Sequence, residues 1–529
     1  MSARIVLINP PVVRPCEPPA GLAGLSGALK QCGIAHRLID INLEGILHKL
    51  ESPALLPDHA DTWTRRALKH RVHHLALLKS REGYRDIDRY RRAVNDINRI
   101  LEWSSRPFEV TAGLANYQDQ KLSPMKSSDL FIAAERPAAN SFYPYFHSRL
   151  SRIIEQESPA VIGISLNYLS QALSTFAMAG FIRRTYPALK IIIGGGLVTS
   201  WMRRAGWQSP FGGLIDDMIA GPGEMPLLQS LGITALPSAT GPDFDQLNSH
   251  DYLSPGAILP FVTATGCYWR RCTFCPEKAE GNRYQPLAIT DALASLQRLS
   301  ETMQPSLIHF LDNALSPAFL SALIKDPPGI PWYGFARITD HLADPGFCKA
   351  LNDSGCVMLK LGLESGDQSV LDHLEKGIDL ETAAAALKTL KQAGIGTYVY
   401  LLFGTPSETP AGAYRTLDFA AKHSDCIGFL NLAIFNLPAG TPDAAALDTE
   451  SFYEGDLSLY CDFRHPEGWS RMEVRRFLDR EFRRHPAIAP IVKRDPPFFT
   501  SNHAPFFLLH GGLRGSHNRA RKRGGRPGE

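Results

Sequence analysis

The sequence lacks the features that mark membrane-spanning, secreted and nucleic-acid-binding proteins. It contains no run of 18 or more apolar residues, so no membrane span is expected. The apolar run near the N-terminus is interrupted by Pro10 and Pro11 and has neither a basic start nor a small-residue cleavage site. We therefore expect a cytoplasmic protein without a secretory signal. The chain has 56 Lys and Arg against 53 Asp and Glu, and this balance gives no support for nucleic-acid binding.

Cysteines are few and unevenly placed. Three of the nine crowd into residues 267–275, whereas the others are scattered at Cys16, Cys32, Cys348, Cys356, Cys426 and Cys461. This distribution is unlike a disulfide framework. It is typical of a reduced metal or iron–sulfur site in a chain whose other cysteines are ordinary buried residues.

The composition is that of a folded protein of several domains. The chain has 529 residues, of which 44% are hydrophobic and 21% charged. In the first part, short β-branched runs alternate with stretches of helical periodicity. The expected strands are 4–9, 36–41, 160–166, 190–193 and 217–220, with helices at 21–32 and around 173–181. This alternation predicts an α/β, doubly wound (Rossmann-like) parallel sheet over 1–240.

A long insertion, about 46–150, interrupts this first series. Residues 62–101 have helical spacing and many basic residues, which favours a helical cap with a solvated basic face. A substrate-binding lid or a surface for an anionic partner is the alternative. Residues 104–145 are rich in Pro, Ser, Asn and Tyr, and we expect an irregular loop there.

A second alternating series predicts a partial (β/α)6 barrel over 255–442. Its expected strands are about 261–265, 306–312, 331–336, 358–364, 396–403 and 427–435, with helices at 289–303, 316–325, 345–354 and 380–393. Active residues of parallel barrels lie at the C-terminal ends of the strands. A small helical domain over 443–510 would close the open side of the barrel, and the basic tail 511–529 should be disordered.

The sharpest motif is Gly266-Cys267-Tyr-Trp-Arg-Arg-Cys272-Thr-Phe-Cys275-Pro276, directly after an expected strand. Three thiolates in one loop can hold a soft metal site. A [4Fe–4S] cluster with three protein ligands would leave one iron open for a substrate or cofactor. Structural zinc normally needs four ligands. The next histidine in the sequence, His309, lies far beyond the loop and gives no nearby fourth ligand. Zinc and three unrelated buried cysteines remain as alternatives.

Residues 261–442 resemble the radical S-adenosylmethionine (radical SAM) superfamily. The usual first gap between the cysteines is three residues, and here it is four. The other matches follow the strand order. They are His309-Phe-Leu-Asp312-Asn313, Arg337 with Asp340, Leu361-Gly-Leu-Glu364-Ser365-Gly366, Leu402-Phe-Gly404-Thr-Pro-Ser-Glu408-Thr409 and Leu437-Pro-Ala-Gly-Thr-Pro442.

The resemblance implies a role for each matching residue. Cys267, Cys272 and Cys275 would ligate the [4Fe–4S] cluster, whose open iron binds S-adenosyl-L-methionine (SAM). Phe274 would pack on the adenine, and the strand end at Gly404 would lie beside it. Glu364, followed by Ser365, would bind the SAM ribose or amino group, and Arg337 its carboxylate. Glu364 as a plain surface acid and Arg337 as a partner of Asp340 are the alternatives.

The order of the two predicted domains resembles the cobalamin-dependent branch of these enzymes. The matching cobalamin-binding positions are Asp40, Asn42 and Gly45 in a loop after the second strand, then Ser165, Gly194 and Gly195. Asn42 stands where that branch has a cobalt-ligating His, and an amide is the poorer ligand. The resemblance therefore implies either cobalamin bound without a protein ligand or a structural domain that covers the barrel mouth.

The expected function is reductive cleavage of SAM to a 5′-deoxyadenosyl radical, used for cobalamin-dependent methylation of an unactivated carbon in a small molecule or peptide. A flavodoxin or ferredoxin would supply the electron. One alternative is a cobalamin-independent radical SAM oxidoreductase, lyase or cyclase. Another is a non-catalytic iron–sulfur protein for electron transfer or sensing. A methylthiotransferase acting on nucleic acid is disfavoured, because the chain has no second cysteine triplet.

Overall fold

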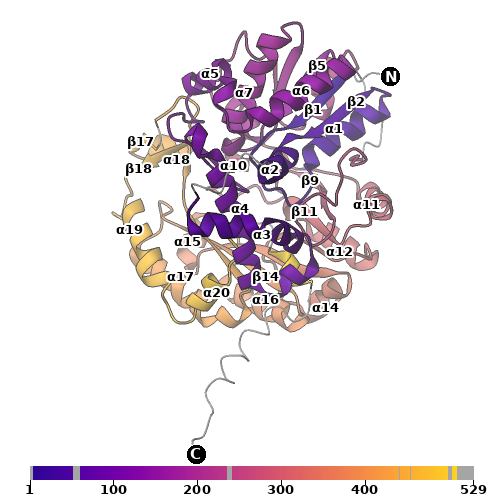
Figure 1. Cartoon of the computed structure of the whole chain (residues 1–529). Coiled ribbons are helices and arrows are strands. Elements are labelled where there is room, and N and C mark those ends of the chain that lie inside the picture. The colour runs from indigo at the N-terminus through magenta and orange to yellow at the C-terminus, as the bar shows by residue number, and fades with distance from the viewer. Residues whose placement is uncertain are drawn as a thin grey trace, which may run out of the picture.

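The computed structural model describes residues 4–51, 60–234, 241–439, 441–452, 454–497 and 503–508. Two parallel sheets dominate these residues, one of five strands and one of six (Figure 1). None of the helices in the described ranges has both the length and the apolar character that crossing a membrane requires. The basic tail predicted at 511–529 lies outside the described residues.

The five-stranded sheet confirms the doubly wound prediction. Its strands are β1 (Ile5–Asn9), β2 (His36–Asp40), β5 (Val161–Ser165), β6 (Lys190–Gly194) and β7 (Asp217–Ile219), in the order β2-β1-β5-β6-β7. Alternate residues of β1 enter different cores, with Ile5 and Leu7 on one face and Val6 and Ile8 on the other. Because both of its faces are buried, the central strand β1 is an almost continuous apolar run. The helices connecting the strands are α1 (Ala20–Gln31), α7 (Leu169–Thr185), α8 (Gly196–Met202) and α9 (Glu224–Ser230).

The insertion after β2 is more regular than predicted. It contains α2 (Ile41–Glu51), α3 (Thr62–Leu78), α4 (Ile87–Ser105), the hairpin β3 (Val110–Ala112) and β4 (Tyr117–Asp119), α5 (Ser127–Glu135) and α6 (Tyr143–Glu157). The irregular loop expected at 104–145 is therefore wrong. The apolar stripe of α5 packs on α7, where Gly180 lets the Ala134 backbone approach closely.

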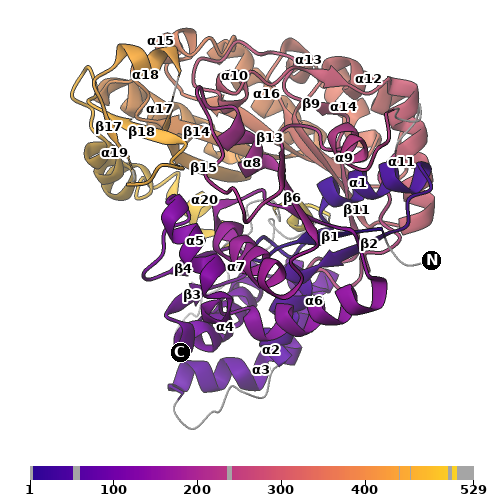
Figure 2. The ribbon, with the colours of Figure 1, turned by 90° about the horizontal axis from the view of Figure 1, so that it is seen from above.

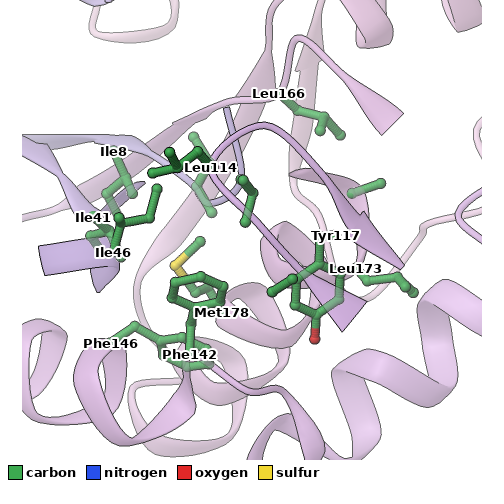
Figure 3. Packing of buried hydrophobic residues seen from close by; sticks show 14 of the residues in the cluster. Ile8, Ile41, Ile46, Leu114, Tyr117, Phe142, Phe146, Leu166, Leu173 and Met178 are labelled. Atoms are coloured by element: carbon green, nitrogen blue, oxygen red, sulfur yellow. The ribbon is translucent and has the colours of Figure 1, made fainter. Parts of the chain in front are cut away.

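The core beneath the five-stranded sheet joins this insertion to the sheet (Figure 3). Ile8 from β1 and Leu166, which follows β5, belong to one cluster with Ile46 of α2, Phe146 of α6 and Met178 of α7. The same cluster continues into the other sheet through Tyr333, Met358, Tyr398 and Phe429. The two sheets therefore share one hydrophobic core.

The six-stranded sheet confirms the partial barrel. Its strands are β8 (Ile258–Phe261), β11 (Leu307–Leu315), β12 (Trp332–Ala336), β13 (Cys356–Glu364), β14 (Gly396–Phe403) and β15 (Phe429–Ile434), paired in chain order and all parallel. The intervening helices include α11 (Ile289–Met303), α12 (Pro317–Lys325), α14 (Pro345–Asp353), α16 (Leu380–Ala393) and α17 (Pro410–Lys422). The first strand ends at Phe261, earlier than expected, and β9 (Ala264–Thr265) pairs antiparallel with β10 (Gln285–Pro286).

The C-terminal region is only partly helical. β16 (Leu437–Pro438), β17 (Thr449–Ser451) and β18 (Tyr460–Phe463) form a small antiparallel sheet that the sequence patterns did not predict. The helices α19 (Arg471–Phe477) and α20 (Ala489–Lys493) then pack beside β15, the last strand of the barrel sheet (Figure 2). They contact the strand at the edge of the sheet.

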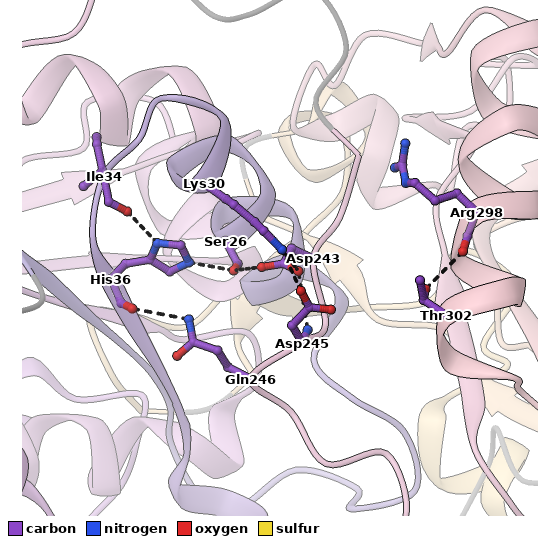
Figure 4. Close-up of polar contacts among 9 residues, drawn as sticks. All are labelled: Ser26, Lys30, Ile34, His36, Asp243, Asp245, Gln246, Arg298 and Thr302. Atoms are coloured by element: carbon purple, nitrogen blue, oxygen red, sulfur yellow. Dashed lines mark hydrogen bonds and ion pairs between the residues drawn. The ribbon is translucent and has the colours of Figure 1, made fainter. Parts of the chain in front are cut away.

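A linker segment, residues 241–247, is held against α1 and β2 of the N-terminal half (Figure 4). Asp243 accepts hydrogen bonds from Ser26 and Lys30 of α1, and Lys30 also donates to Asp245. Gln246 donates to the His36 carbonyl and accepts from the Leu38 amide, so the linker is held along β2.

Candidate functional site

The three clustered cysteines lie in the loop between β9 and α10 (Pro276–Ala279), after the first barrel strand. Their half-buried thiols line one small cavity, which is also lined by Arg270, Glu277, Lys278 and Asn282. Gly266 has φ +70°, and a Cβ at this position would lie 2.5 Å from the Arg283 carbonyl oxygen. The glycine is therefore needed for the close turn that begins the loop.

The chemistry of this donor set fits an iron–sulfur cluster. Burial raises the pKa of the Cys272 and Cys275 thiols, and the nearby charges of Lys376 and Arg337 act in the opposite direction on Cys272. Within the described ranges, no three His, Cys, Asp or Glu side chains are gathered closely enough for a single metal ion. Thiolates of one cluster, by contrast, bind different irons and need not converge on one point.

Arg337 follows β12 and is buried against the cysteine loop. Its Nη1 lies 4.0 Å from Cys272 Sγ, its Nη2 donates to the Lys376 carbonyl, and its guanidinium carbon lies 4.0 Å from the centre of the Trp269 ring. These partners hold the guanidinium next to the thiols. The alternative partner, Asp340, belongs to α13 (Asp340–Ala343) and is not the residue that holds Arg337.

Glu364 ends β13 in an unusual backbone conformation, with φ +70°. Its side chain is 12% exposed and accepts a hydrogen bond from Lys376 Nζ at 2.8 Å, so it is not a plain surface acid. A non-glycine residue at positive φ costs energy and occurs most often at functional sites. The same ammonium lies 5.5 Å from the ring centre of Phe274, which links the acid to the cysteine loop.

Lys376 is a site residue that the sequence patterns missed. It lies in the turn between α15 (Gln368–His373) and α16, outside every strand end, and its side chain is 8% exposed. The only signal in the sequence was a lysine before a glycine between two short helices. Its importance depends on the fold, which brings this turn against the cysteine loop.

The remaining barrel candidates have structural partners. The Ser365 hydroxyl is buried, lies 3.0 Å from Thr416 Oγ1 and accepts from the Asp367 amide. Gly404 has φ +77° and donates its amide to Glu408 Oε2, which also accepts from Trp469 Nε1. Burial raises the pKa of Glu408 to about 7. A cofactor role for Ser365 and Gly404 stays a prediction, and both residues shape the strand ends.

The residues around β2 differ from the loop expected there, because α2 begins at Ile41 and includes Asn42 and Gly45. Asn42 is buried, accepts from the Val13 amide at 2.9 Å and donates to the Val13 carbonyl at 2.8 Å. Asp40 accepts from Asn9, from the Leu43 amide and from Tyr252. A Cβ on Gly45 would lie 3.0 Å from the Phe142 ring. These contacts give all three residues packing roles.

The glycine turn after β6 is more open. Gly195 has φ +110°, and a Cβ there would lie 2.6 Å from the Leu166 carbonyl oxygen. Asn167 spans this turn, since it donates to Ser165 Oγ and accepts from the Gly196 amide. Glu280 is the residue that follows α10. Its Oε1 accepts a hydrogen bond from the Ser200 hydroxyl of α8 at 2.5 Å. The helix after the glycine turn and the helix after the cysteine loop are thereby joined.

Comparison with known proteins identifies one domain of the chain. Residues 261–420 match the family model described as the radical SAM superfamily. These residues form a radical SAM domain. The matched range covers the cysteine loop, Arg337, Glu364 and Gly404, so the candidate site lies within the radical SAM domain.

Relatives of the chain include named methyltransferases. An uncharacterized methyltransferase of Pyrococcus horikoshii is 23% identical over 320 residues, which are 52% of this chain and 67% of the relative. Bacteriochlorophyllide d C-12(1)-methyltransferase of Chlorobaculum tepidum is 24% identical over 214 residues, 38% of this chain and 46% of the relative.

The fold of the whole chain is also similar to a solved structure. The radical SAM methyltransferase TsrM of Kitasatospora setae, with tryptophan substrate and a SAM analogue bound, has a TM-score of 0.58 at 16% identity and covers 98% of this chain and 99% of its own. A second structure of TsrM, with cobalamin and a [4Fe–4S] cluster bound, has a TM-score of 0.51 at 17% identity, over 84% of this chain and 75% of its own. At these identities the similarity shows a shared fold.

Proposed function

We propose that this chain is a cobalamin-dependent radical SAM methyltransferase that methylates an unactivated carbon of a small molecule or peptide. The observation that carries the proposal is the junction between the two sheets. The hydrogen bond from Ser200 to Glu280 joins α8, which follows the glycine turn, to the residue after α10, the helix that follows the cysteine loop. A methyl carrier held at that turn and SAM held at the cysteines would then share one reaction space.

Cys267, Cys272 and Cys275 are the residues that would hold the [4Fe–4S] cluster. The bound and reduced cluster supplies the electron that cleaves SAM into methionine and a 5′-deoxyadenosyl radical. Lys376 and Arg337 place positive charge beside Cys272 and so favour its thiolate form.

The residues around the cysteines would bind the three parts of SAM. Arg337 offers a buried, planar guanidinium to the carboxylate. Glu364, held by Lys376, would accept hydrogen bonds from the amino group or ribose. Phe274 lies between two cysteine ligands and would pack on the adenine.

Residues 194–196 are the part of the N-terminal sheet that fits cobalamin. The strand ends there in three consecutive glycines, which let the backbone approach a bulky ligand, and Ser165 ends the neighbouring strand. When bound, cobalamin supplies a methyl group to the substrate. Asn42 is fully engaged by Val13, so we expect cobalamin to be held without a protein ligand from this position.

The names of the relatives support methyl transfer, and those of the TsrM structures support cobalamin and a [4Fe–4S] cluster as cofactors. The electron would come from a flavodoxin or ferredoxin. A cobalamin-independent radical reaction is the alternative, and the following experiment separates the two.

The test is anaerobic reconstitution of the full chain with iron and sulfide, with and without hydroxocobalamin. We expect iron-dependent absorbance, cleavage of SAM under a chemical reductant, and bound corrin after gel filtration. The triple variant Cys267→Ala, Cys272→Ala, Cys275→Ala should lose both the iron and SAM cleavage, whereas Cys426→Ala, remote in sequence from the loop, should retain both. Full SAM cleavage by the triple variant would overturn the proposal. Cleavage by the wild type without any corrin uptake would identify the cobalamin-independent alternative.

A further inference from the structure

The turn formed by residues 374–377, between α15 and α16, is fastened to the cysteine loop by its backbone. The Thr273 amide donates to the Leu374 carbonyl at 3.1 Å. The indole Nε1 of Trp269 donates to the Glu375 carbonyl at 3.0 Å. Arg337 donates to the Lys376 carbonyl. Three consecutive carbonyls of one turn therefore hold the loop, its tryptophan and the arginine beside it.

Trp269 and Arg337 also contact each other directly. The guanidinium carbon lies 4.0 Å from the centre of the indole ring, well inside the range of a cation–π interaction. Arg337 is only 8% exposed, and desolvation strengthens such a contact. The ring therefore both attracts the guanidinium and limits its orientation.

Gly377 lies directly against the indole ring of Trp269. It has φ +62°, and a Cβ at this position would lie 2.2 Å from Trp269 Cζ2. Any side chain here would displace the ring. The backbone conformation of the turn and the space it leaves are both matched to a tryptophan.

The four-residue gap between Cys267 and Cys272 provides this tryptophan. The gap consists of Tyr268, Trp269, Arg270 and Arg271, and Arg270 has φ +52°. A non-glycine residue at positive φ is uncommon, and this one directly follows Trp269, whose indole packs on the turn. The loop thus bends at Arg270 after placing Trp269 against the turn.

We propose that Trp269 is a positioning residue that fixes the guanidinium of Arg337 for the carboxylate of SAM. This inference rests on the proposed function, in which Arg337 binds that carboxylate. One amino group of Arg337 donates to the Lys376 carbonyl, and one face of its guanidinium packs on the indole. The rest of its planar fork is held in one orientation before SAM arrives, and such preorganisation increases affinity by reducing the ordering cost of binding.

The test compares Trp269→Leu with Trp269→Phe in the reconstituted full chain. The dissociation constant for SAM is measured from the change in the electron paramagnetic resonance signal of the reduced cluster, without turnover. We expect Trp269→Leu to weaken SAM binding by about tenfold and Trp269→Phe, which keeps a ring over the guanidinium, by about threefold or less. Iron and sulfide content should stay at the wild-type level in both variants.

Trp63→Leu is the matched control. Trp63 also has an arginine over its ring, with Arg99 at 5.0 Å, but it lies on α3 in the insertion. This substitution should leave SAM affinity unchanged. If Trp63→Leu weakens SAM binding as much as Trp269→Leu does, the effect is not specific to the contact between Trp269 and Arg337, and the inference is wrong.

A double-mutant cycle with Arg337→Lys separates positioning from a general loss of structure. Lysine keeps the charge but has no planar group to stack on the indole. In this background Trp269→Leu should change SAM affinity by less than twofold. An undiminished tenfold effect there would overturn the inference. So would loss of the cluster in both Trp269 variants, because the tryptophan would then be needed for the loop itself. Failure of the wild type to bind SAM would instead overturn the proposed function.

Discussion

Glu17 holds His309 through both carboxylate oxygens, each 2.9 Å from the imidazole Nδ1. Glu17 lies in the segment that follows β1, whereas His309 is in β11 of the barrel. Because an ionised carboxylate only accepts, Nδ1 carries the proton, and Nε2 is left to accept from Lys360 Nζ at 2.9 Å. Burial lowers the pKa of His309 to about 4 and that of Lys360 to about 7. A buried polar chain therefore connects the two sheets.

Removing Glu17 should destabilise the protein strongly. Glu17→Ala would leave the buried Nδ1 donor of the neutral His309 without its acceptor, which costs about 1–3 kcal/mol. Urea unfolding of the apoprotein measures the change. Glu82→Ala, which removes an exposed acid paired with Arg89, is the control and should cost under about 1 kcal/mol. Equal effects of the two substitutions would contradict the importance of the buried chain.

Glu408 should make stability depend on pH. Burial raises its pKa from 4.5 to about 7 in the folded protein, so the folded state binds this proton more tightly than the unfolded state. Its contribution is present in full below about pH 4.5 and is lost as the pH rises to about 7. The loss is about 3 kcal/mol.

Glu408→Gln should remove that pH dependence. Its amide oxygen can still accept from the Gly404 amide and the Trp469 indole, which both bond to Oε2 in the wild type. Urea unfolding of both proteins at pH 5 and pH 8 is the measurement. The variant should lose less stability than the wild type over this interval, and parallel losses would show that Glu408 titrates normally.

Lys376 should be needed for SAM binding more than for folding. Lys376→Met removes the 2.8 Å contact to Glu364 and the positive charge near Cys272. Losing a charged hydrogen bond at the ligand site should raise KM for SAM by about tenfold. Steady-state SAM cleavage and iron analysis measure the two effects.

Lys349→Met is the matched control for Lys376. The Lys349 side chain is 73% exposed and pairs with Asp353 on the surface of α14. The control should behave as wild type in both assays. A Lys376→Met protein with unchanged KM would show that Glu364 needs no lysine partner.

Asn42 should matter for stability and not for the spectrum of bound corrin. Asn42→Ala removes both hydrogen bonds to Val13 and leaves a buried amide and carbonyl without partners, at a cost of about 2–3 kcal/mol. Thermal unfolding should show this loss. The absorbance of added hydroxocobalamin should match that of the wild type, and a spectral shift specific to the variant would show that Asn42 touches the cobalt.

Regular periodicity made much of the fold predictable. Most strands of both parallel sheets are rich in apolar residues, and β14 begins and ends at the predicted residues, 396 and 403. Short elements were harder. The helix α5 has only nine residues, and its packing on α7 depends on Gly180, which lies far along the chain.

The candidate site was predictable where the chain itself carries the signal. The three cysteines lie within one loop, and Glu364 and Arg337 occur at strand ends, where parallel barrels place functional groups. Lys376, by contrast, reaches the site only because a connection between two helices folds back onto the loop. No local pattern encodes that return, since it depends on tertiary packing.

The shared core described above has an evolutionary consequence. Val6 and Ile8 of one sheet lie in the same cluster as Tyr333 and Phe429 of the other. In this cluster, neither half of the chain forms a complete hydrophobic core by itself. A recombinant gene that exchanged the first half for that of a distant homologue would bring together surfaces with unmatched shapes. The two halves of this enzyme must therefore diverge together, through paired substitutions across their common interior.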